Sequence, residues 1–118
     1  MAYVNTCVIA VPKANRERYA QHSKVMSALF KEYGALEAVD LVGVEITDGQ
    51  QTSFIKAVQC KDSEEIVLSW IVWPSRKMSE EQMPKVMQDA RSREQQNQTE
   101  EPLFDGRRAI FGNFEPVS

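Results

Sequence analysis

Histidine and cysteine are scarce in this chain, which excludes several kinds of site. Its 118 residues include one histidine and two cysteines. Protein zinc sites take most of their ligands from groups of histidine and cysteine at short spacings, and the sequence has no such group. It also lacks a glycine-rich phosphate loop and the partners for a Ser-His-Asp or Cys-His arrangement. We therefore predict neither a metal site nor a bound cofactor.

Long apolar runs and clustered positive charge are absent as well. No window approaches the roughly 18–20 consecutive apolar residues of a membrane span, and the first residues lack the basic stretch and apolar core of a secretory signal. The 14 Lys and Arg residues are scattered among 17 Asp and Glu residues, for a net charge of −3. Nucleic acids are bound through clustered cations, so we expect neither a nucleic-acid nor a membrane partner. Few cysteines and no export signal favour the cytoplasm.

What the chain does contain is typical of one globular domain. Apolar residues make up 42% of the sequence and charged residues 26%, which are ordinary proportions for a folded protein. A chain of 118 residues is long enough to bury a core without disulfides or metals. No repeat or linker divides it, and we predict a single domain over residues 1–118.

The segment from Ile66 to Trp73 is the most informative part of the chain. It reads Ile-Val-Leu-Ser-Trp-Ile-Val-Trp, and a turn signal follows at Pro74. Side chains alternate between the two faces of a strand. The apolar residues are Ile66, Leu68, Trp70 and Val72 on one face and Val67, Ile71 and Trp73 on the other. Because both faces are apolar, this strand is predicted to be central and covered on both sides.

Strand and helix patterns alternate along the rest of the chain. Strands are predicted at 3–11, 36–46, 53–60, 66–73 and 108–117, and helices at 15–33 and from Ser75 onward. Asn15 and Gly34 have the residue types that cap the first helix. Pro84 is expected to break the second helix into two pieces near residues 82–83. The polar run 91–101 is predicted to be a solvated loop or a frayed helix end.

This order of elements is that of a ferredoxin-like α+β fold with one additional strand in the middle. The segment 53–60 is predicted to form a hairpin with the central strand. Either 36–46 or 54–60 is the neighbour of that strand, and the sequence leaves the choice open. The two helices are expected to cover one face of the antiparallel sheet. The other face then requires a partner, predicted to be a second copy of the chain, with Val8 and Ile71 on the partner's side.

Several short motifs follow one another over nearly the whole chain. They are Val11-Pro12-Lys13, Gly34-Ala35-Leu36-Glu37, Ser69-Trp70-Ile71-Val72, Pro74-Ser75-Arg76, Lys85-Val86-Met87, Phe104-Asp105-Gly106, Gly112 and Phe114-Glu115. In this order and spacing they resemble the YbaA-like family of uncharacterised bacterial proteins. The resemblance implies a dimeric α/β barrel, in which two ferredoxin-like subunits pack sheet against sheet, and it implies no activity. The chain departs from the family pattern in the polar run 91–101 and at Asn113, where a glycine is common.

Seven residues are predicted to line a cleft between the helices and the sheet. They are Asn5, His22, Glu37, Trp70, Trp73, Arg76 and Phe111. His22 lies on the inner stripe of the first helix, where a structural histidine bonded to its neighbours is the commoner outcome. In one hypothesis Trp73 and Arg76 form the wall for a flat or anionic ligand. In the other they are a core side chain and a cation at a helix start.

The carboxylates Glu37 and Asp40 are three residues apart on a predicted strand, hence on opposite faces, which excludes an acid/base pair unless a bulge between them changes the parity. One is expected to face water and the other to pair with a basic residue such as Lys56 or Arg108. The two cysteines, at positions 7 and 60, are predicted to be small buried side chains in strands rather than reactive thiolates.

Two functional hypotheses remain. In the first, which rests on fold analogy, the cleft binds a small, mostly apolar molecule, with cofactor-independent oxygenase or isomerase chemistry as one form of this function. In the second, the protein is a non-catalytic binding or assembly module without a filled pocket. Polar groups that converge on a cavity of at least ~300 Å³ would favour the first. The sequence leaves open whether the protein is an enzyme.

Overall fold

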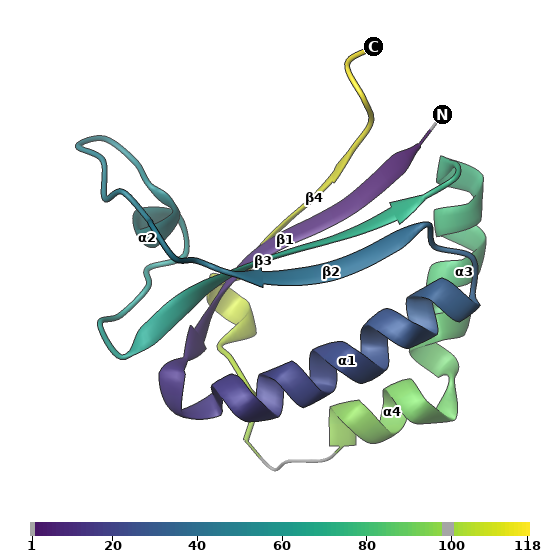
Figure 1. Ribbon diagram of the computed structural model, residues 1–118, viewed down its shortest axis with the longest axis horizontal. Coiled ribbons are helices and arrows are strands. Elements are labelled where there is room, and N and C mark those ends of the chain that lie inside the picture. The colour runs from purple at the N-terminus through teal and green to yellow at the C-terminus, as the bar shows by residue number, and fades with distance from the viewer. Residues whose placement is uncertain (1, 98–100) are drawn as a thin grey trace.

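A four-stranded antiparallel sheet, with three helices packed on one face, forms the body of the protein (Figure 1). The computed structural model describes residues 2–97 and 101–118. The strands are β1 (Tyr3–Pro12), β2 (Glu37–Val42), β3 (Glu64–Trp73) and β4 (Ile110–Phe114), and the helices are α1 (Arg16–Glu32), α2 (Phe54–Ala57), α3 (Arg76–Gln88) and α4 (Ala90–Asn97). The strand order β2-β3-β1-β4 confirms the ferredoxin-like α+β fold.

The two central strands, β1 and β3, pair along their whole length. Their register places Val8 opposite Leu68, while β2 pairs with the free edge of β3 and β4 with the free edge of β1. The prediction that 66–73 is a central strand is therefore confirmed. The neighbour that the sequence left open lies in segment 36–46.

The face of the sheet that the helices cover carries the odd-numbered residues of β1 and β3. Trp73 has no exposed surface there, and its ring meets that of Phe30 edge to face at 6.4 Å. The Trp73 indole N–H donates to the side-chain oxygen of Asn5 at 2.7 Å, and the Ser79 hydroxyl donates to the same oxygen at 3.1 Å. Ile71 packs into the same core. Its predicted position on the partner's side is wrong, because it shares its parity with Trp73.

The chain itself covers part of the opposite face. Between β2 and β3, the excursion 43–63 leaves the sheet and carries the short helix α2 (Figure 1). Val58, at the end of α2, is fully buried and packs against Val8 and Ile66. Val8 therefore lies on the second face of the sheet, as predicted, but its own chain covers it.

The predicted strand at 53–60, and with it the predicted hairpin, is wrong. The Ser53 hydroxyl accepts a hydrogen bond from the Lys56 backbone N–H at 3.0 Å, which caps the N-terminus of α2. The period of a short apolar run does not show whether the run is a strand or a buried helix. The capping residue Ser53 was the local signal that indicated a helix. Cys60 consequently lies outside the sheet, whereas Cys7 lies in β1.

Helix α1 has nearly the predicted extent, but no side chain caps its N-terminus. Asn15 makes no side-chain cap; it ends a 3-10 turn that precedes the helix, and its side-chain amide donates to the Leu103 carbonyl at 3.0 Å. Asn15 therefore holds the predicted N-cap position, but its side-chain amide anchors the segment that leads to β4 and does not cap the helix. At the other end Gly34 has φ +110°. This left-handed conformation is the one expected of the glycine that ends a helix.

Pro84 does not interrupt α3. The helix is continuous from residue 76 to residue 88, with Pro84 exposed, so the lost backbone hydrogen bond lies on a side that water reaches. Ser75 is the predicted N-cap, and its hydroxyl accepts from the Met78 N–H at 3.2 Å. The helix ends at Asp89, whose backbone is extended. The two helical pieces meet there rather than near residues 82–83.

The polar run 91–101 is helical over most of its described part. Ser92 in α4 is fully buried, and its hydroxyl accepts from the Gln96 side chain at 3.3 Å. Residues 91–97 therefore belong to a separate helix with a buried position, which is neither the solvated loop nor the frayed helix end predicted. Residues 98–100 lie outside the described part. None of the helices within residues 2–97 and 101–118 is long and apolar enough to cross a bilayer.

An ion cluster joins the start of β3 to the turn before β4. Arg108 donates to both carboxylate oxygens of Glu64, at 2.8 and 2.6 Å, and to Asp105 at 3.2 Å. A further bond to the Gln59 carbonyl, at 2.7 Å, ties the excursion 43–63 to the same guanidinium. Because Arg108 belongs to a 3-10 turn, β4 begins only at Ile110 and is shorter than the strand predicted at 108–117.

Replacing Glu64 with glutamine is expected to make folding stability less sensitive to acid. Hydrogen bonds from Arg108 hold the pKa of Glu64 below its ordinary 4.5. A carboxylate of this kind stabilises the fold above its unfolded pKa, and the contribution is lost as the pH falls through the folded pKa. In urea unfolding from pH 7 down to about pH 3, Glu64→Gln should show a pH slope shallower by up to about one proton per molecule. A Glu64→Gln protein whose pH slope equals that of the wild type would contradict the prediction.

Candidate functional site

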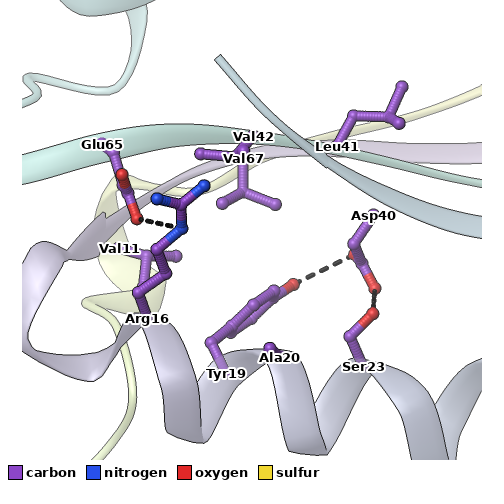
Figure 2. Close-up of a pocket in the computed structure, with 10 residues that line it drawn as sticks. All are labelled: Val11, Arg16, Tyr19, Ala20, Ser23, Asp40, Leu41, Val42, Glu65 and Val67. Carbon is purple, nitrogen blue, oxygen red and sulfur yellow. Dashed lines mark hydrogen bonds and ion pairs between the residues drawn. The ribbon is translucent and has the colours of Figure 1, made fainter. Parts of the chain in front are cut away.

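A cleft opens between α1 and the β2 edge of the sheet, on the face that the helices cover (Figure 2). Its volume is about 260 Å³, and it is lined by Val11, Arg16, Tyr19, Ala20, Ser23, Asp40, Leu41, Val42, Glu65 and Val67. The valines come from three different strands and form an apolar wall between two groups of polar side chains. This composition, apolar surface with a few convergent polar groups, is typical of a small-molecule site.

Asp40 is the polar centre of the cleft. The Tyr19 hydroxyl donates to one of its carboxylate oxygens at 3.1 Å, and the Ser23 hydroxyl donates to the other (Figure 2). Tyr19 and Ser23 are four residues apart on α1 and so project from the same side of the helix. A carboxylate has about four acceptor positions, so two hydroxyl donors leave acceptor capacity on Asp40.

Neutral groups alone hold the Asp40 carboxylate. Within the described part of the chain no cation pairs with it, and its hydrogen bonds come from two hydroxyls. Burial, to which the charge of Asp40 adds, raises the pKa of Tyr19. The phenol therefore stays protonated at physiological pH and remains a donor. Burial also raises the pKa of the Cys7 thiol, which disfavours a reactive thiolate there.

Arg16 and Glu65 lie at the other end of the cleft (Figure 2). The Arg16 Nε atom is 3.4 Å from a Glu65 carboxylate oxygen, with the arginine side chain 63% exposed and the glutamate 16%. These two charges offset each other, so the cleft retains one negative charge, on Asp40. Within residues 2–97 and 101–118 no three His, Cys, Asp or Glu side chains are grouped closely enough to hold a metal ion.

Three of the seven predicted site residues lie at the α3 end of the core, away from this cleft. Asn5 and Trp73 are hydrogen-bonded to each other. Because Trp73 is fully buried, it is a core side chain and does not wall a cleft. Arg76 lies over the Tyr3 ring, 5.8 Å from its centroid, and pairs with Glu80 at 2.8 Å. The core and helix-start alternatives are therefore the ones observed for Trp73 and Arg76.

The other four predicted residues are dispersed. Trp70 and Glu37 are on the sheet face opposite the helices, and Phe111 is 75% exposed on the edge strand β4. His22 lies beside Tyr19, with its ring centroid 5.9 Å from that of Tyr19, but it is not among the residues that line the cleft. Its buried Nδ1 atom has no hydrogen-bond partner among the described residues, unlike the bonded histidine expected. The seven residues do not share one cavity, and ligand contact by any of them stays a prediction.

The sequence placed Glu37 and Asp40 on opposite faces correctly but chose the wrong partners for the inward carboxylate. Lys56 and Arg108, the expected cations, pair with other carboxylates at 3.2 and 2.6 Å. The missed signal was an aspartate at an inward position of a strand, between two inward apolar residues. A tyrosine and a serine at helical spacing of four, on the preceding helix, were the second part of that signal.

Comparison with known proteins agrees with the motifs in the sequence. Residues 2–106 match the family described as protein of unknown function DUF1428. The chain belongs to the DUF1428 family. It is 38% identical over 117 residues to the uncharacterized protein YbaA of Escherichia coli K12, and equally to that of Shigella flexneri, which covers 99% of this chain and 97% of each relative. The predicted kinship with the YbaA-like proteins is confirmed.

Two solved structures share the fold of this DUF1428 protein. The structure of Rv0793 from Mycobacterium tuberculosis aligns with a TM-score of 0.57 at 9% identity, covering 100% of this chain and 97% of that one. A putative antibiotic biosynthesis monooxygenase from Nitrosomonas europaea aligns with a TM-score of 0.52 at 8% identity, covering 98% and 90%. At such low identity the likeness concerns the fold alone.

Proposed function

We propose that this DUF1428 protein is a cytoplasmic homodimer that binds a small, mostly apolar molecule in the cleft between α1 and β2. One observation carries the proposal: Asp40 is a partly buried carboxylate, held by two hydroxyls and no cation of the described chain, beside an apolar wall. Removing a charge from water costs free energy. A few polar groups placed in a mostly apolar cleft are what fixes the orientation of a small ligand. The two free cysteines suit a reducing compartment.

The lining of the cleft, rather than its size, supports a small ligand. Its volume of about 260 Å³ is below the ~300 Å³ expected of a site for a drug-sized molecule, so only a compact ligand fits. Val11, Val42 and Val67 offer the ligand an apolar wall, and Asp40 with its two hydroxyl donors offers it a polar end. A ligand with one polar group on a compact apolar body matches this lining.

The homodimer is supported by the sheet face opposite the helices. Leu68 on this face belongs to the patch under the excursion 43–63. Beyond that patch, the apolar residues of the face are Val4, Val39, Leu41, Trp70, Val72, Ile110 and Phe114, with Thr6 and Glu37 among them. Phe114 is 58% exposed, and Leu41 and Ile110 are each 43% exposed. A largely apolar face of this kind marks an interaction surface. A second copy of the same face covers it in a self-complementary way about a two-fold axis.

The area of the face agrees with a stable dimer. Such interfaces bury about 800 Å² per partner, roughly a tenth of the 7970 Å² surface of this chain. Four strands about 4.8 Å apart, with the central two 10 residues long, give the whole face an area of that order, and the excursion 43–63 itself covers part of it.

Proton-transfer catalysis is a second candidate function, favoured by the Tyr19–Asp40 pair. A carboxylate is able to take a proton from a bound substrate, and the Tyr19 hydroxyl that donates to Asp40 would hold this base in place. A positioned base of this kind is compatible with cofactor-independent isomerase or oxygenase chemistry. The fold shared with a putative antibiotic biosynthesis monooxygenase is compatible with this chemistry, although one fold hosts many functions. A non-catalytic assembly module is the alternative to both, and it requires an empty cleft.

Native mass spectrometry of freshly purified protein tests the proposal, with a denatured aliquot of the same sample as reference. A dimer with additional mass that denaturation removes is the expected result. Ala20, on α1, lines the cleft, so Ala20→Trp should fill the cleft and abolish the additional mass. Ala28 is an exposed alanine of the same helix, and Ala28→Trp should retain it. A bare dimer would favour the assembly module, and a monomer would contradict the homodimer.

A further inference from the structure

We propose that the ligand of the cleft carries a protonated amine, which binds Asp40 as the ammonium. This inference rests on the proposed function and adds the chemical class of the ligand. It follows from the charges, the hydrogen-bonding capacity and the apolar lining of the cleft.

The charges of the cleft call for a cation. Arg16 and Glu65 pair with each other at 3.4 Å, so they leave no net charge at their end. Asp40 receives hydrogen bonds from two neutral hydroxyls and has no ion pair within the described residues. A carboxylate that loses water when a ligand binds is compensated best by an opposite charge with its own donors. An ammonium supplies both.

The hydrogen-bonding geometry suits the same group. One hydroxyl donates to each carboxylate oxygen of Asp40, which leaves acceptor capacity on both. The Tyr19 oxygen is itself an acceptor, and burial keeps its phenol protonated by raising its pKa. A primary ammonium has three donors and no acceptor. It therefore matches a site whose remaining capacity is to accept.

Ligands of other charge fit less well. A ligand carboxylate in the position of the ammonium would be repelled by the like charge of Asp40. The nearby hydroxyls of Tyr19 and Ser23 already donate to Asp40 and have no further O–H for the ligand. A neutral alcohol is able to donate one hydrogen bond but leaves the charge uncompensated in a cleft closed by the ligand. The valine wall contributes equally to all three classes, because it contacts the apolar body alone.

Three probes with one carbon skeleton test the inference: phenethylamine, phenethyl alcohol and phenylacetate. Each is titrated at neutral pH into ¹⁵N-labelled protein, and the amide shifts of Ala20, Ser23 and Asp40 report binding in the cleft. The amine should bind at least about tenfold more tightly than the alcohol, and phenylacetate should bind most weakly. Equal or tighter binding of the alcohol or of phenylacetate would overturn the inference.

Asp40→Asn keeps the shape of the side chain and removes its charge. It should weaken binding of phenethylamine by about tenfold or more and change binding of the alcohol by less than about threefold. Glu81→Gln removes a charge from α3, outside the residues that line the cleft, and it should leave both affinities unchanged. Ser23→Ala keeps the Asp40 charge and should retain the preference for the amine. This second variant keeps the inference testable if Asp40→Asn does not fold.

The outcomes separate this inference from the proposed function. If the alcohol shifts the cleft amides as strongly as the amine and Asp40→Asn has no effect, the cleft binds small molecules but the amine is wrong. If no probe shifts these amides while native mass spectrometry shows a ligand that Ala20→Trp excludes, the amine is again wrong and the proposed function stands. If neither probes nor a co-purified ligand occupy the cleft, both fail.

Discussion

Replacing Trp73 with alanine is expected to lower the free energy of unfolding by about 3–5 kcal/mol, the cost of deleting a buried aromatic ring. The side chain has no exposed surface and packs edge to face against Phe30. Its indole N–H is also the donor to Asn5 at 2.7 Å, and truncation would leave that oxygen with the Ser79 hydroxyl alone. A cavity and a weakened buried hydrogen bond therefore act in the same direction.

Urea unfolding at fixed protein concentration measures this effect, because the stability of a dimer depends on concentration. Phe111 provides a matched control, since it is a large aromatic residue that is 75% exposed. Phe111→Ala should stay within about 0.5 kcal/mol of the wild type. A loss of less than about 1 kcal/mol in Trp73→Ala would show that Trp73 is not a core residue, and would reopen its role as the wall of a cleft.

Replacing Trp70 with glutamate is expected to convert the proposed dimer into a monomer. Trp70 is half-buried on the sheet face opposite the helices, between Thr6 on β1 and Val39 on β2. Tryptophans near the centre of an interface each contribute about 2 kcal/mol or more, and a symmetric dimer contains two. The dissociation constant should therefore rise by roughly 10³-fold, before the cost of burying the new charge is added.

Sedimentation velocity over a range of concentrations measures the change in assembly. Met87 is the control position, because it is apolar, 39% exposed and located on α3, away from the sheet. Met87→Glu should remain dimeric, and circular dichroism should show a folded protein for both variants. A Trp70→Glu protein that stays dimeric at micromolar concentration would refute packing of sheet against sheet.

The two tryptophans illustrate what local sequence patterns are able to predict. They are three residues apart on one strand, so the alternation of side chains places them on opposite faces whatever the rest of the chain does. Both faces of the strand were apolar in sequence, and the strand is indeed central. The pattern of the strand does not show which of its two faces the helices cover, and Ile71 was assigned to the wrong face for that reason.

Local rules failed where a tertiary contact outweighed them. The run from Phe54 to Ala57 has strand-like residues, yet it folds as a capped helical turn, with Val58 buried against the sheet. Pro84 is an exposed position of a helix held by its packed side, so the proline did not end it. Asn15 has a good capping side chain, but that amide bonds a carbonyl 88 residues away.

The sequence by itself determined the order of the four sheet strands and the parity of the central strand, because these depend on spacings within a few residues. Short motifs along the chain likewise determined its kinship with the YbaA-like proteins. The tertiary structure alone decided that β2 lies beside β3, that the excursion 43–63 covers part of the second face, and that Asp40 meets the hydroxyls of α1. The contacts to Asp40 join residues 21 and 17 positions apart. Their distance is set by how a helix packs on a sheet, and the pattern of either element alone does not contain it.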